Sequence, residues 1–98
     1  MDPVWIVCLE VLAFIDASPG TGKLGFINVV ASAPDESSVV ERVRECLRDY
    51  GWEILGIESV SIAEPDREHQ DDLSELIERV TANRDHILLS TLYSYKPN

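Results

Sequence analysis

Basic side chains are scarce in this sequence of 98 residues. Lysine and arginine together number 8, against 18 aspartate and glutamate residues, and the net charge at pH 7 is −10. Proteins that bind DNA or RNA neutralise phosphates with clustered lysine and arginine, and anionic membrane surfaces attract the same side chains. We therefore expect no direct contact with nucleic acid and none with a membrane surface.

Cysteine and histidine are also rare, with 2 of each. Cys8 and Cys46 belong to no CxxC pair, so the sequence contains no recognised zinc or redox motif. His69 and His86 have no partners at a catalytic or metal-binding spacing, and the carboxylates around His69 fit the start of a helix. We expect no catalytic residue, no cofactor and no metal, so the protein is predicted not to be an enzyme. An enzyme or a small-ligand-binding protein is the less favoured alternative.

Long hydrophobic runs are missing as well. The longest, residues 4–15, is interrupted by Glu10 and is shorter than the roughly 20 residues that a membrane-spanning helix needs. The only charge before it is the negative Asp2, which is unlike a secretory signal. Apolar residues occupy both odd and even positions, as in an interior strand or one partly covered on both faces. We predict a buried strand here and a cytoplasmic protein with reduced cysteines.

The sequence does contain a regular succession of strand-like and helix-like segments. β-Branched and aromatic residues predict strands over residues 4–15, 24–33, 52–62 and 86–95. The first two strands are separated by residues 16–23, whose length and turn-forming composition predict a hairpin.

Two segments between the later strands have apolar residues at helical spacing. In the first segment these residues are Val39, Val43, Cys46, Leu47 and Tyr50, and in the second they are Leu73, Leu76, Ile77 and Val80. Ser38 with Glu41 fits a capping box at the start of the first helix, and Asp35 is an alternative cap. Gly51 fits the position just past the end of that helix.

The predicted element order is β-β-α-β-α-β, within a single globular domain over residues 1–98. Right-handed crossovers through both helices would make the second, third and fourth strands parallel, with the first strand antiparallel to the second. Both helices would then cover one face of the sheet. The sequence thus predicts an α+β fold, a two-layer α/β sandwich with a four-stranded mixed sheet.

Residues 19–23, PGTGK, resemble the core of the phosphate-binding loop in AAA-type P-loop ATPases. In that family the glycine-rich loop and the lysine bind phosphates, and a following serine or threonine ligates Mg²⁺. Here Ala17 stands at the position of the first motif glycine, and Leu24 stands at that of the Mg²⁺ ligand. Because a strand is predicted after Lys23, where that family has a helix, the sequence favours a hairpin loop.

Negative charge is concentrated between residues 58 and 78. Eight acidic residues lie in this window, opposed by Arg67 alone. Because the apolar residues of the second helix take its inward face, the neighbouring acidic residues lie mainly outward. Five of these residues form what we call the acidic ridge, to which we assign partner binding. They are Glu68, Asp71, Asp72, Glu75 and Glu78.

A concentrated negative surface has two interpretations. It keeps a small protein soluble, and it steers encounter with positively charged partners. The favoured hypothesis is a small acidic non-enzymatic protein-binding module that blocks a basic protein surface, such as the phosphate channel of a nucleic-acid-binding protein. Inhibitors such as toxin-immunity proteins and anti-CRISPR proteins use this strategy, and the comparison with them rests on size and charge alone.

Self-association is the alternative function. If the strand at residues 86–95 lies at a sheet edge, it is open to pairing with another chain. Tyr93 and Tyr95 fall on one of its faces, where they would anchor a homodimer. The protein would then serve as a homo-oligomeric structural or regulatory subunit.

Overall fold

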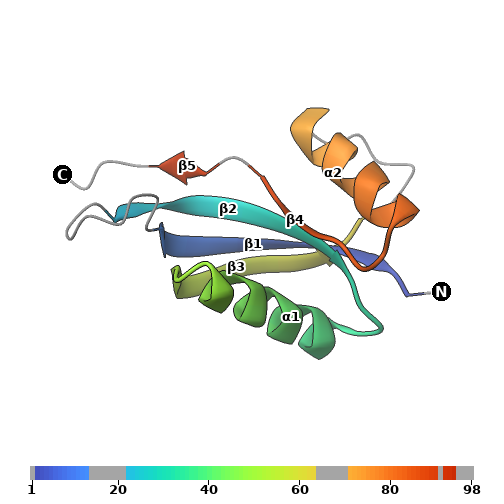
Figure 1. The fold of residues 1–98 in the computed structure, drawn as a ribbon, viewed down its shortest axis with the longest axis horizontal. Coiled ribbons are helices and arrows are strands. Elements are labelled where there is room, and N and C mark those ends of the chain that lie inside the picture. Colours follow the sequence, from blue (N-terminus) through green and yellow to red (C-terminus); the bar gives the residue numbers. More distant parts are fainter. Residues whose placement is uncertain (1, 14–21, 64–70, 91, 95–98) are drawn as a thin grey trace.

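The structure is a computed structural model, which describes residues 2–13, 22–63, 71–90 and 92–94. Within these ranges the elements follow the predicted order, with the last strand divided in two (Figure 1). The strands are β1 (Val4–Ala13), β2 (Lys23–Ser32), β3 (Glu53–Ile62), β4 (Ile87–Leu89) and β5 (Tyr93–Ser94), and the helices are α1 (Glu36–Asp49) and α2 (Asp71–Ala82).

The strands form one sheet with the order β3-β1-β2-β4, in which β5 also pairs with β2. β1 pairs antiparallel with β2 on one side and with β3 on the other. β2 and β3 therefore run in the same direction, as predicted, but β1 lies between them. β4 pairs antiparallel with β2, opposite to the predicted direction. The α+β class is confirmed, whereas the predicted mixed sheet is corrected to antiparallel pairing throughout the described strands.

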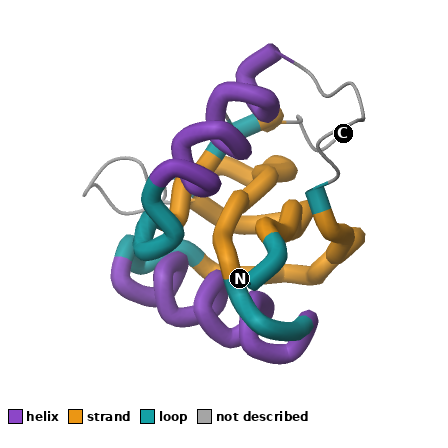
Figure 2. Tube along the Cα trace, turned by 90° about the vertical axis from the view of Figure 1, so that its right-hand side faces the viewer, coloured by secondary structure: helices purple, strands orange, loops and turns teal. Residues whose placement is uncertain are grey.

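The two helices lie on opposite faces of the sheet, which corrects the predicted two-layer arrangement (Figure 2). Successive residues of a strand point to opposite faces, and in β2 Val29 packs in the cluster with α1 while Val30 packs in the cluster with α2. The prediction was wrong because it treated the connection through α2 as a parallel crossover. β3 and β4 run in opposite directions at opposite edges, so the crossover rule does not place α2 beside α1.

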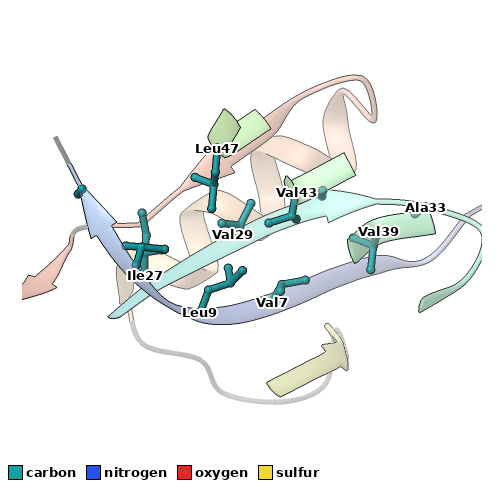
Figure 3. Packing of buried hydrophobic residues seen from close by; sticks show 11 residues of the cluster. Val7, Leu9, Ile27, Val29, Ala33, Val39, Val43 and Leu47 are labelled. Carbon is teal, nitrogen blue, oxygen red and sulfur yellow. The ribbon is translucent and has the colours of Figure 1, made fainter. Parts of the chain in front are cut away.

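The larger core lies between α1 and the sheet. Val39, Val43 and Leu47 of α1 are fully buried there (Figure 3). The strand residues of this cluster are Val7, Leu9, Val11, Ala13, Ile27, Val29 and Ala31. On β1 these are the odd-numbered residues, so the predicted alternation along the strand and the apolar stripe of the helix are both confirmed.

A smaller core lies under α2. Val80 is fully buried against Val4, Val30 and Ala63. The half-buried side chains that pack around it are Ile6, Leu73, Leu76, Ile77 and Leu88. Because Val4, Ile6 and Val30 point away from the larger core, β1 and β2 have an apolar patch on each face.

Local signals define both ends of α1. The backbone N–H of Ser38 donates to Oδ1 of Asp35 at 2.8 Å, so Asp35 rather than Ser38 is the N-cap. At the other end, Gly51 has a φ of 76°, in the left-handed region that glycine adopts without strain. The backbone N–H of Trp52 then donates to the carbonyl of Leu47 at 3.0 Å. The predicted stop at Gly51 is confirmed.

Replacement of Asp35 by alanine should lower the free energy of unfolding. This free energy should then fall less steeply as the pH is lowered. Hydrogen bonds from Ser38 lower the pKa of the Asp35 carboxyl below its ordinary value. A lowered pKa contributes stability that is present above the unfolded-state pKa and is lost as the pH falls through the folded-state pKa. The difference between wild type and Asp35→Ala should therefore shrink between about pH 7 and about pH 2.5.

Urea unfolding at the two pH values measures this effect. Glu41→Ala is the matched control, because Glu41 is an exposed carboxylate in the middle of the same helix. A difference between wild type and Asp35→Ala that stays constant across the pH range would contradict the assignment of the cap.

Candidate functional site

Two residues of the acidic ridge lie fully within the described structure. Glu75 and Glu78 are exposed on α2, whereas the apolar residues of the same helix pack against the sheet. The predicted inward and outward faces of α2 are therefore confirmed for this part of the helix. Asp71 and Asp72 begin α2, but their side chains lie outside the description, as does the whole of Glu68.

The fold presents α2 as a layer of its own. Its contacts are chiefly with β1, β2 and β4, on the face opposite α1 (Figure 1). The outer side of α2 thus points away from the sheet, which accounts for the exposure of Glu75 and Glu78. The only basic residue in the sequence of this helix is Arg79 in its last turn, so the helix itself supplies no row of arginine or lysine beside the carboxylates.

A second acidic stripe, which the sequence reasoning did not single out, lies on α1. Glu41, Glu45 and Asp49 are exposed, and their four-residue spacing places them on one side of the helix. Because the two helices cover opposite faces, this stripe belongs to a different layer from the acidic ridge. The four-residue spacing of these carboxylates is visible in the sequence. Arginines lie between them, however, so a count of charge along the segment does not reveal an acidic stripe.

Two grooves flank α1. The β4-side groove has a volume of about 320 Å³ and is lined by Arg42, Glu45, Cys46, Asp49, Tyr50 and Ile87. The β3-side groove has a volume of about 520 Å³ and is lined by Arg44, Arg48, Gly51, Trp52, Glu53 and Ile54. Each groove lies between a helix side and a sheet edge, so the order of the strands creates them.

The cysteine in the β4-side groove is poorly suited to nucleophilic chemistry. Burial and the nearby Asp49 raise the pKa of the Cys46 thiol, an effect that Arg42 partly offsets. Burial, with a contribution from Glu58, also raises the pKa of Cys8. A thiol with a raised pKa is protonated at neutral pH, and the thiolate is the reactive form. Both cysteines are half-buried and free.

Histidine and carboxylate side chains do not converge on a metal site in the part of the chain that the structure describes. A ring nitrogen of His86 lies 3.2 Å from the side-chain amide of Asn83, in the turn that follows α2. This contact gives His86 a role in the turn, and His69 lies outside the described residues. Across the same described ranges, no helix is long and apolar enough to cross a membrane.

The segment that resembles a phosphate-binding loop is followed by a strand. Lys23 is the first residue of β2, and its pairing with Ala13 of β1 confirms the predicted hairpin. Residues 14–21 lie outside the described ranges. A phosphate-binding loop requires the N-terminus of a helix at this point, so the resemblance does not extend to the fold that follows the motif.

The predicted last strand is interrupted at Ser90. The backbone N–H of Ser90 donates to the carbonyl of Asn28 at 2.8 Å, and the Ser90 hydroxyl accepts from the N–H of Asn28 at 3.0 Å. Pairing with β2 resumes at Tyr93. The side chain of Tyr93 and the whole of Tyr95 lie outside the description, so their role in self-association stays a prediction.

The two edges of the sheet differ in length. The edge formed by β4 and β5 is short and interrupted, whereas β3 is a strand of 10 residues that pairs only with β1 in the described sheet. Leu55 and Ile62 of β3 are 45% and 50% exposed. The sequence reasoning considered an edge at the last strand, and β4 does lie at one edge of the described sheet, but the longer edge strand is β3.

Comparisons with known proteins returned no match: no protein-family model, no curated protein and no solved structure is similar to the chain. The fold therefore defines only the class, an α+β protein with an antiparallel sheet and a helix on each face. The features of the described structure that bear on function are the exposed charges, the two grooves and the edge strand β3.

Proposed function

We propose that this protein is a small acidic protein-binding module, which uses the acidic ridge on α2 to occupy a basic surface of another protein. The observation that carries the proposal is the exposure of Glu75 and Glu78 on a helix that forms its own layer. The remaining members of the ridge, Glu68, Asp71 and Asp72, extend the same charge along the sequence.

Electrostatics favours one class of partner. Concentrated charge of one sign raises the rate of encounter with the opposite charge and discourages partners of the same charge. The channels of nucleic-acid-binding proteins are lined with lysine and arginine, so a helix with a row of carboxylates competes for the same groups as a phosphate backbone. The favoured activity is therefore inhibition by occupation of such a channel, with no bond made or broken.

Charge reversal on α2 should abolish partner capture. Glu75→Lys/Glu78→Lys replaces attraction by repulsion, and we expect at least a roughly tenfold loss of affinity. The immobilised protein is incubated with lysate of the source cells at low and at high salt, and the captured protein is then purified for calorimetry with each variant. Wild type should lose the partner at high salt, because salt screens exposed charges.

The control is Glu41→Lys/Glu45→Lys on α1. It changes the net charge by the same amount and also replaces exposed carboxylates, but it lies in the opposite layer and should leave capture intact. If the α2 variant retains the partner as well as wild type does, the ridge serves solubility only. If both variants lose the partner equally, net charge rather than the α2 surface governs binding.

A further inference from the structure

We propose that β3 and the β3-side groove form a second binding site, which takes an extended segment of a partner protein as an added antiparallel strand. Apolar side chains of that segment would lie along β3, and an acidic side chain near its C-terminal end would lie between Arg44 and Arg48. The site is on different elements from the acidic ridge, and the inference does not rest on the function proposed for that ridge.

The backbone of β3 supplies the first part of the argument. An edge strand presents N–H and C=O groups without strand partners, and natural proteins protect such an edge with lysine, proline, bulges or a covering segment. β3 contains neither residue and pairs with β1 alone among the described strands. Two register shifts against β1 interrupt it and leave residues 59–62 as its longest regular stretch. This stretch is long enough to begin the pairing used in peptide recognition by strand addition.

Exposed apolar side chains supply the second part. Among the described residues the large hydrophobic side chains that are exposed are Tyr50, Leu55 and Ile62. Two of them belong to β3. The third, Tyr50, lines the β4-side groove, and its ring centroid lies 5.8 Å from that of Trp52 in the β3-side groove. Leu55 and Ile62 thus place two exposed apolar side chains along the same strand, where an extended segment would cover both.

The arginines of the β3-side groove supply the third part. Arg44 and Arg48 are exposed one helical turn apart on α1, and neither side chain has a hydrogen-bond or ion-pair partner in the described part of the chain. Guanidinium groups form strong charge-assisted hydrogen bonds with carboxylates. An added strand whose acidic residue lies beside the start of β3 would provide the missing partner, with Trp52 and Ile54 beneath it.

A segment of another protein fits this site better than a second copy of the chain. Each copy has a net charge of −10. Antiparallel pairing of two β3 strands would also bring Glu53 and Glu58 of both copies to the same edge, and like charges in a sheet are destabilising. A short peptide with one or two carboxylates meets less repulsion, because it brings fewer negative charges to the edge.

A titration followed by nuclear magnetic resonance tests the proposal on the full chain. The probe is the peptide acetyl-Thr-Val-Thr-Val-Thr-Val-Asp-Asp-amide, which alternates apolar and polar residues and carries its carboxylates at the end that antiparallel pairing brings to the groove. We expect changes in amide shifts confined to β3, its neighbour β1 and the second half of α1. Amide exchange along β3 should slow in the complex, because its free N–H groups acquire acceptors.

Matched variants and peptides separate the site from general charge effects. Arg48→Glu should weaken the peptide about tenfold, whereas Arg79→Glu, the same change at an exposed position on α2, should leave the affinity unchanged. A peptide with Lys-Lys in place of Asp-Asp, and one that is N-methylated at alternate residues, should each bind more weakly.

Three results would overturn the proposal. The first is that the amide shifts of β3 do not respond to the probe at millimolar concentration. The second is that Arg48→Glu and Arg79→Glu bind the probe equally well. The third is that β3 shifts change with protein concentration alone while light scattering shows a doubled mass, which would assign the edge to a second copy.

Discussion

Replacement of Leu9 by alanine should lower the free energy of unfolding by about 2–5 kcal/mol. Leu9 is fully buried on β1, in the cluster that also contains Val43 and Leu47 of α1 (Figure 3). β1 is hydrogen-bonded to β2 on one side and to β3 on the other. The backbone therefore cannot move toward α1 to fill the space, and the loss of dispersion contacts adds to the loss of hydrophobic burial.

Urea unfolding followed by circular dichroism measures this loss. A domain of this size is stable by only about 5–15 kcal/mol, so the expected change is a large share of the total. Leu55→Ala is the matched control, because it makes the same chemical change on the neighbouring strand at a position that is 45% exposed. If the two variants were equally stable, Leu9 would not belong to the core.

Replacement of Arg42 by methionine should cost about 1.5–3 kcal/mol, the usual range for a hydrogen bond to a charged group. The guanidinium of Arg42 donates to the backbone carbonyl of Ser32 and, at 3.4 Å, to that of Asp85. These bonds join α1 to the end of β2 and to the turn before β4. Ser32 is itself buried, so its carbonyl loses a partner that water does not readily replace.

Ser32 accepts hydrogen bonds from an arginine of α1 and from an arginine in the turn after α2. Arg84, in the turn after α2, donates to the backbone carbonyl of Asp2 and, at 3.4 Å, to the hydroxyl of Ser32. Because Arg42 and Arg84 share this residue, the effects of Arg42→Met and Arg84→Met should not be additive, as is usual for residues in one network. Their double variant therefore reports whether the two layers are coupled at this end of the sheet.

The control for the Arg42 prediction is Arg44→Met. Arg44 is exposed on the same helix, and its replacement should change the stability by no more than about 0.5 kcal/mol. Hydrogen exchange gives a second measurement, in which Arg42→Met should speed exchange at the end of β2 and in β4. If Arg42→Met and Arg44→Met had the same stability, the hydrogen bonds of Arg42 would contribute nothing.

The proposed interaction surfaces can be tested separately because they lie on different elements. Glu75 and Glu78 of the acidic ridge are on α2, on one face of the sheet, whereas Arg44 and Arg48 are on α1, on the other face. A charge change at one surface should leave the other unaltered, since salt screens exposed charges beyond roughly 8 Å. Failure of one proposal therefore leaves the other standing.

Local signals in the sequence were sufficient for the elements themselves. Gly51 ends α1 through a local signal that is readable without a tertiary structure, whereas Asp35 was one of two caps that the sequence allowed. The hairpin of β1 and β2 was also predictable, because strands joined by a short turn-rich segment pair with each other. The outward position of Glu75 and Glu78 followed from the 3.6-residue period of the helix.

The direction of β4 and the face covered by α2 were not predictable in this way. Both depend on which strand pairs with which, and β4 pairs with β2 across more than fifty residues of sequence. One signal in the sequence did indicate cover on both faces of the sheet, but the prediction placed both helices on one face. Apolar residues at both parities of the first strand, such as Ile6 and Val7, indicated cover on both faces, and one helix on each face provides it.

By itself, the sequence determined the α+β class, the order of the elements, the C-terminal end of α1 and the negative charge of α2, because each depends on composition or on neighbours within a few residues. The tertiary structure alone decided that α2 forms its own layer and that β3 is the longer edge strand of the described sheet. It also decided that Arg44 and Arg48 lie beside that edge. These features depend on pairing between distant strands, which is selected by the packing of both sheet faces at once rather than by any local pattern.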